Sequence, residues 1–337
     1  MSVALPALVV GFAAGAVMAR GGLCFNRALR QAAFERHPAL LRAFGVAVAV
    51  QLVLLPALVA LGVDPLVRNA EAGGLPLLPV AQVIGGLAFG AGMALAGGCV
   101  TGMLWKAGRG AVALAIAIAG FGAGELLIRG PGRDVISALD DASRPSERSL
   151  ADVLGVGYEP LALVLGVLAL VVMLRLGWRG ALRGVALGVV AAAAWVAADL
   201  AGYGYGLGFV GAAEGTRRAI AAGADLPFSL YLAVGVLVGA ALSGRRRLRL
   251  PDSARAARAL AGGLLMGVGG SLAHGCNIGH GLTGLPLLSL GSLLATAAMA
   301  AGALLTWRFV LEPSPRLRGL ERSARRMGAW NVAGGAR

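Results

Sequence analysis

Three cysteines are the side chains of this sequence best suited to chemistry, and each lies just after glycine in an apolar stretch. Cys99 directly follows Gly98, Cys276 directly follows Gly275, and Cys24 comes two residues after a glycine pair. A thiol is a weak donor with a polarizable sulfur, so it suits a sulfur-bearing ligand. One buried cysteine alone is more often an inert apolar residue, but the shared context of all three favours a function.

Polar residues near these cysteines offer further contacts. His280 follows Cys276 by four residues and either contacts a ligand or makes a structural hydrogen bond. Asn277 is expected to cap a short helix more than to bind. Arg20, at the end of an apolar run, is either an anchor at the membrane interface or an attractor of anions. All three are candidate binding residues, together with the cysteines and the glycines Gly98 and Gly275.

Other chemistries fit this pattern less well. Cysteine with His274 and His280 could ligate zinc, but the sequence has no C-x-x-C and no acidic residue close to a cysteine. We therefore predict no metal and no cofactor, and a metal-binding membrane protein is the third-ranked hypothesis. The only lysine, Lys106, lies outside any P-loop pattern. Since there is also no evident catalytic triad or carboxylate pair, the sequence does not indicate an enzyme.

The composition is that of an integral membrane protein. Hydrophobic residues make up 58% of the 337 residues, 14% are charged, and the mean hydropathy is +0.80. Apolar runs of about 20 residues recur, and each can cross a hydrocarbon core of about 30 Å. Short alternating segments, typical of a β-barrel, are absent. We predict an all-α fold with about nine spans, at residues 3–19, 40–63, 80–98, 109–128, 158–176, 182–200, 228–244, 259–274 and 288–310.

The net charge of +14 comes from arginines that cluster in short connections and in the tail. Every second connection is basic, which indicates topology and does not require a nucleic-acid partner. By the positive-inside rule, the N-terminus lies outside and the C-terminus lies in the cytoplasm.

Residues 85–102 and 262–279 repeat one pattern, with ten of 18 aligned positions identical. The first copy runs inward and the second outward, which is typical of an inverted-topology repeat. The predicted parts are a first half-repeat (1–128), a periplasmic loop (129–157), a linker span (158–176), a second half-repeat (177–311) and a basic cytoplasmic tail (312–337).

Each copy of the repeat is expected to hold a broken helix. Glycine weakens a helix and lets the backbone approach a ligand. The apolar stretches after the turns, 100–105 and 278–285, are too short to span. We predict a helix, a Gly-Cys turn and a short half-helix whose free N–H groups favour anions. Cys99 and Cys276 should then face each other across a pseudo-two-fold axis, while Cys24 aligns with Ala197 and has no cysteine counterpart.

The motifs resemble those of the YeeE/YedE family of sulfur-compound transporters. Residues 274–286 look like its second signature, 97–102 are similar to its first, and 20–25 resemble its N-terminal Arg/Cys segment. The resemblance implies thiosulfate uptake through the cytoplasmic membrane, an inverted-repeat helical fold, and cysteines that touch the ion in turn. Residues 100–105 depart from the family by being more apolar than its His-bearing version.

The leading hypothesis is therefore a transporter for thiosulfate or a similar small anion, embedded in the lipid bilayer of the inner membrane. A second hypothesis is a membrane protein that passes sulfane sulfur to a cytoplasmic sulfur-carrier protein. A transporter of selenium compounds is a further alternative, since some relatives are tied to selenium metabolism.

Overall fold

The computed structural model describes residues 3–63, 75–143, 149–178 and 180–311, and its regular elements in these ranges are helices. The predicted basic tail, 312–337, lies outside the described residues. Nine helices of 15 or more residues match the predicted spans one by one. They are α1 (Ala4–Gly21), α3 (Ala39–Ala60), α5 (Pro79–Ala96), α7 (Val112–Arg129), α10 (Tyr158–Leu176), α11 (Ala181–Leu200), α13 (Phe228–Leu242), α14 (Ser253–Leu272) and α15 (Leu290–Thr306).

The all-α membrane fold is confirmed, while the count of nine crossings stays a prediction. Seven helical stretches of the described chain are long and apolar enough to cross a membrane. The apolar helix α13 is shorter than these, and α14 is not among them. The remaining short elements are α2 (Phe25–Phe34), α6 (Val100–Gly108), α8 (Arg133–Asp141), α9 (Leu150–Leu154), α12 (Ala212–Ala222) and two π-helices, η1 (Gly279–Gly284) and η2 (Trp307–Leu311).

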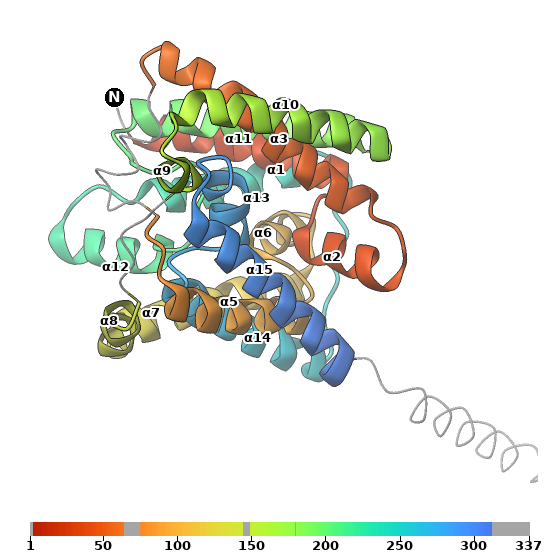
Figure 1. The fold of residues 1–337 in the computed structure, drawn as a ribbon. Coiled ribbons are helices and arrows are strands. Elements are labelled where there is room, and N and C mark those ends of the chain that lie inside the picture. Colours follow the sequence, from red (N-terminus) through yellow and green to blue (C-terminus); the bar gives the residue numbers. More distant parts are fainter. Residues whose placement is uncertain (1–2, 64–74, 144–148, 179, 312–337) are drawn as a thin grey trace, which may run out of the picture.

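The long helices form two groups with the short helix α6 between them (Figure 1). In one group α1 packs on α13 and α11, and α3 packs on α11 and α10. In the other, α5 packs on α14 and α15, and α7 packs on α14. Helix α10 is mostly exposed and contacts α3 at the margin of the bundle.

Glycines let the helix backbones touch. A methyl group on Gly90 of α5 would collide with the Met299 carbonyl of α15, and one on Gly267 of α14 would collide with the Phe121 carbonyl of α7. Such contacts between small residues are how helices associate in lipid, where apolar burial gives little driving force.

These glycine contacts exchange between the two halves. In the alignment of residue 85 with residue 262, Gly85 of α5 faces Gly269 of α14, and the equivalent Gly262 faces Gly92. Likewise, α1 packs its glycines on α13, while the matching helix α11 packs its glycines on α3. Two elements related by a two-fold axis must exchange partners in this way, so the contacts support the proposed inverted repeat.

The helix, turn and short helix predicted at Cys99 and Cys276 are present, and the same arrangement occurs at Cys24. Helix α5 ends at Ala96, Gly97 adopts a left-handed conformation (φ 79°), and α6 begins after Cys99. Helix α1 ends in the same way at Gly22 (φ 63°), before Cys24 and α2. After α14 the left-handed residue is His274 (φ 60°), and a short helix with the π-helical turn η1 follows Cys276.

The packing of α7 on α14 gives a test with a matched control in the same helix. A methyl on Gly124 would collide with the Leu264 carbonyl, whereas one on Gly122 would meet only Ala213 Cβ at 3.5 Å. We expect Gly124→Ala to cost about 1–3 kcal/mol through overpacking. Gly122→Ala should be neutral or stabilising, since alanine favours a helix by about 1 kcal/mol. The midpoint of thermal denaturation of each purified variant, monitored by size-exclusion chromatography, measures these effects. Equal midpoints for the two variants would contradict this packing.

Candidate functional site

Two of the three thiols meet in the interior. The Cys24 and Cys99 Sγ atoms are 3.7 Å apart, and both side chains are fully buried. This is far beyond the roughly 2.05 Å of a disulfide, and all three cysteines are free. Each of the two residues directly precedes a short helix, Cys24 before α2 and Cys99 before α6. The breaks in α1–α2 and α5–α6 therefore bring the two sulfur atoms into contact.

Gly102, one turn into α6, makes room for this pair. A methyl group at this position would lie 2.6 Å from Cys24 Sγ and 3.1 Å from Cys99 Sγ. No side chain fits there unless the thiols move. The Thr101 hydroxyl lies 3.6 Å from Cys99 Sγ, so it can donate to or accept from that thiol.

Cys276 aligns with Cys99 in the second copy of the repeated motif. Its Sγ accepts the Gly279 N–H at 3.3 Å. Gly279 stands three residues after its cysteine, as Gly102 does, and a methyl there would lie 3.1 Å from the Tyr205 hydroxyl. That hydroxyl is buried without a hydrogen-bond partner among the described residues. The contact that the structure makes between thiols joins Cys24 with Cys99, whereas Cys276 bonds to its own short helix.

The two polar residues near Cys276 have different surroundings: His280 has hydrogen-bond partners on both ring nitrogens, and Asn277 has none among the described residues. His280 is held on both sides, because Nε2 donates to the Ala273 carbonyl at 2.9 Å and Nδ1 lies 3.0 Å from Ser292 Oγ. A methyl on Gly275 would lie 2.6 Å from the His280 ring, so this glycine makes room for the imidazole. Asn277 makes no capping bond, contrary to expectation. Its buried amide nitrogen and oxygen have no partner in the described chain.

The other predicted site residues lie at the two glycine turns. Gly98 is buried directly before Cys99. Arg20 is exposed on the last turn of α1, and it is not among the residues that line the basic cavities below. The counterpart expected for Cys24, Ala197, lies inside α11, whereas Cys24 lies beyond the end of α1.

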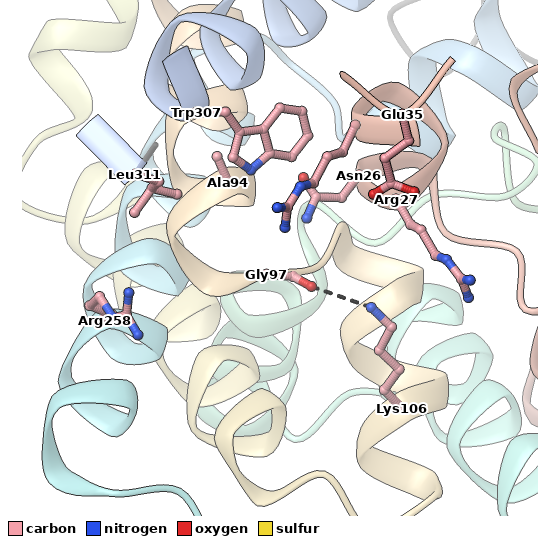
Figure 2. Close-up of a pocket in the computed structure, with 10 residues that line it drawn as sticks. Asn26, Arg27, Glu35, Ala94, Gly97, Lys106, Arg258, Trp307 and Leu311 are labelled. Carbon is pink, nitrogen blue, oxygen red and sulfur yellow. Dashed lines mark hydrogen bonds between the residues drawn. The ribbon is translucent and has the colours of Figure 1, made fainter. Parts of the chain in front are cut away.

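A basic cavity of about 470 Å³ opens beside the thiol pair. Lys106 of α6 lies at its edge, where the ammonium is 3.6 Å from Cys24 Sγ and 3.3 Å from the Gly97 carbonyl. Figure 2 shows Lys106 reaching toward Gly97, with Asn26 and Trp307 on another side of the cavity. Asn26 is buried, and its side-chain oxygen has no partner among the described residues.

A second basic cavity, of about 620 Å³, shares Arg27, Gly97 and Lys106 with the first. Its described lining contains no carboxylate. The further basic residues that line it are Arg109, Arg245, Arg247, Arg249 and Arg255.

A buried carboxylate elsewhere fastens a connecting helix. Glu125 of α7 is fully buried, and its Oε1 accepts the Glu214 N–H at the start of α12 at 3.0 Å. Glu214 in turn accepts hydrogen bonds from Arg217 and Arg218, which hold its pKa at about 2 although burial acts in the opposite direction. Glu125 is therefore an anchor for α12.

Several site residues were not singled out from the sequence. Gly102 belongs to the repeated motif and could have been found there, because it matches Gly279. Lys106, Asn26 and Tyr205 carry no comparable signal, since their role depends on which distant helices meet. In the described ranges, no three His, Cys, Asp or Glu side chains gather into a group that could hold a metal ion.

The fold and these buried thiols define a multi-pass membrane protein with its polar groups at broken helices. A family model described as sulphur transport matches the chain over residues 20–181 and again over 172–305. The chain therefore belongs to this family of transporters, as its resemblance to the YeeE/YedE proteins predicted. The two matches, one to each half, agree with an internal duplication.

Curated relatives cover nearly the whole chain. It is 30% identical over 322 residues to the thiosulfate transporter TsuA of Spirochaeta thermophila, covering 88% of this chain and 95% of that protein. It is 27% identical over 350 residues to the thiosulfate transporter TsuA of Escherichia coli, covering 94% and 97%. The probable transporter YedE of Escherichia coli is 33% identical over 106 residues, which is 32% of this chain and 24% of that protein. The names of these relatives describe transport and not catalysis.

The thiol pair can be tested by mild oxidation. We expect copper phenanthroline to join Cys24 to Cys99, since their sulfur atoms are already in contact, and to leave Cys276 free. Gly102→Ala should suppress this product, because the new methyl group displaces Cys24 Sγ. Gly281→Ala is the control, since a methyl there meets nothing within 4 Å. Mass spectrometry of unreduced peptides measures the products. A dominant Cys276 disulfide, or an unchanged yield in Gly102→Ala, would refute the arrangement.

Proposed function

We propose that this protein carries thiosulfate, or a closely related sulfur anion, across the cytoplasmic membrane into the cell. The observation that supports this most is the set of three buried thiols at the glycine breaks, with Cys24 and Cys99 in contact. Both full-length relatives named above are thiosulfate transporters. The inward direction rests on the resemblance to the YeeE/YedE family, which implies uptake, and the topology rests on the charge pattern of the connections.

The proposed path runs through the three cysteines. In the predicted orientation, the Cys276 turn lies toward the outside and the Cys24 turn toward the cytoplasm. A dianion that leaves water must exchange its hydration for protein donors. S–H groups and the N–H groups at the starts of short helices can supply these donors. Because a thiol is a weak donor, each contact holds the anion loosely enough for it to move on.

The sulfur-transfer hypothesis makes a different prediction for the cysteines. It requires a thiolate to attack the outer sulfur of thiosulfate, with sulfite as the leaving group, and to pass the persulfide sulfur to a cytoplasmic carrier. Lys106 lies beside Cys24, but among the described residues no side chain that could act as a general base hydrogen-bonds to Cys99 or Cys276. Thiosulfate labelled in its outer sulfur distinguishes the two functions. Label retained on a cysteine without net uptake into vesicles would favour sulfur transfer.

Uptake of labelled thiosulfate in a sulfur-starved strain without its own thiosulfate importers tests the proposal. We expect the wild type to support growth on thiosulfate. Hydrogen bonds to charged groups contribute about 1.5–3 kcal/mol. Cys24→Ala, Cys99→Ala and Cys276→Ala should therefore each lower initial uptake about tenfold or more.

The serine variants at the same positions are the matched controls, since they keep a donor of similar size. They should lose less uptake than the alanine variants at equal amounts of protein in the membrane. A wild type that confers no growth on thiosulfate would refute the proposal, and so would full activity of all three alanine variants. Competition by selenium oxyanions at equal concentration would extend the substrate range to selenium compounds.

A further inference from the structure

The lysine beside the thiol pair is placed differently from the other basic residues. Lys106 lines both basic cavities, and its ammonium turns inward to Cys24 Sγ at 3.6 Å. Basic residues at the cytoplasmic ends of spans are explained by topology alone. That explanation does not account for a cation whose Nζ reaches a fully buried sulfur atom.

The immediate partners of Lys106 among the described residues are a thiol, a carbonyl and an aromatic ring. Its ammonium donates to the Gly97 carbonyl at 3.3 Å and lies 5.6 Å from the ring centre of the adjacent Trp105. No carboxylate forms an ion pair with it among the described residues. The described lining of the first cavity contains one carboxylate, that of Glu35, and four basic side chains, those of Arg27, Arg30, Lys106 and Arg258.

Asn26 gives a second observation at the same place. It is 6% exposed, it lines the first cavity, and its side-chain oxygen has no partner in the described chain. A buried amide oxygen without a partner is costly unless a water completes its bonding. Because this oxygen only accepts hydrogen bonds, Asn26 can contact an anion only through the N–H groups of its amide. Its position on α2, two residues after Cys24, places it on the cavity side of the thiol pair.

We propose that Lys106, with Arg27 and Asn26, forms an inner binding site that receives the divalent anion after it has passed the Cys24–Cys99 pair. This inference rests on the proposed function and deepens it. An anion that leaves two weak thiol donors meets a full positive charge at once, and the large basic cavities beyond offer water for its rehydration. The site therefore acts on the exit step and not on capture from outside.

Three substitutions of Lys106 distinguish an effect of its positive charge from an effect of its hydrogen bond to the Gly97 carbonyl. Lys106→Met removes charge and donor, Lys106→Gln keeps an N–H donor for the Gly97 carbonyl, and Lys106→Arg keeps the charge. We expect Lys106→Met and Lys106→Gln to lower the maximal rate of thiosulfate uptake about tenfold, the lower range for electrostatic effects on rates. The half-saturating concentration should change little, and Lys106→Arg should retain most of the rate. Arg258→Met is the control, because Arg258 lines the same cavity from α14 and makes no contact with a thiol among the described residues.

A second measurement does not depend on transport. Trp307 lines the first cavity and Trp105 the second. In a Trp178→Phe, Trp330→Phe background, which removes the 77% exposed Trp178 and the C-terminal Trp330, iodide quenching of tryptophan fluorescence reports anion access to these cavities. We expect Lys106→Met to reduce quenching by iodide and to leave quenching by neutral acrylamide unchanged, while Lys106→Arg behaves like the wild type.

The outcomes separate this inference from the proposed function. Wild-type uptake with full activity in Lys106→Gln would overturn the inner site and leave thiosulfate transport standing, since lysine would then serve only as a helix cap. Unchanged iodide quenching in Lys106→Met would also overturn it. If the wild type takes up no thiosulfate, the proposed function fails, and the iodide measurement alone decides whether Lys106 attracts anions.

Discussion

Where a helix breaks inside an apolar protein, the backbone N–H and C=O groups at the break need new hydrogen-bond partners. The geometry of the site depends on which side chains supply those partners. At the two breaks that meet, residues of α6 supply the partners. The Trp105 indole donates to the Leu23 carbonyl at 2.8 Å, and the Lys106 ammonium donates to the Gly97 carbonyl. Unsatisfied carbonyls would cost several kcal/mol each in such surroundings. The same side chains therefore stabilise the breaks and place a cation beside the thiols.

The glycines bring these breaks together from distant parts of the sequence. Left-handed turns at Gly22 and Gly97 end two long helices, and Gly102 lets their cysteines come into contact. Contacts such as that of Gly90 in α5 with the Met299 carbonyl of α15 hold the surrounding helices together, backbone against backbone. A glycine in this protein thus acts either as a turn, as a contact between backbones, or as the space that a thiol occupies.

The sequence predicted the helical spans well, because length and hydropathy suffice for that. It also predicted short helices after Gly97 and Gly275, since glycine interrupts an otherwise apolar helix. It did not predict that Cys24 contacts Cys99, because that depends on two turns meeting, before α2 and before α6, that lie 75 residues apart in the chain. The expected cap at Asn277 was wrong for a local reason: the Gly279 N–H donates to Cys276 Sγ, and the Asn277 amide has no partner among the described residues.

The central claim is that the thiols contact the transported anion. A structure of the protein determined with thiosulfate tests it most directly, with the anion located by the anomalous scattering of its sulfur atoms. The account predicts thiosulfate within hydrogen-bond distance of at least one of Cys24, Cys99 and Cys276. Thiosulfate bound only at sites remote from all three thiols, with their surroundings unchanged, would contradict it.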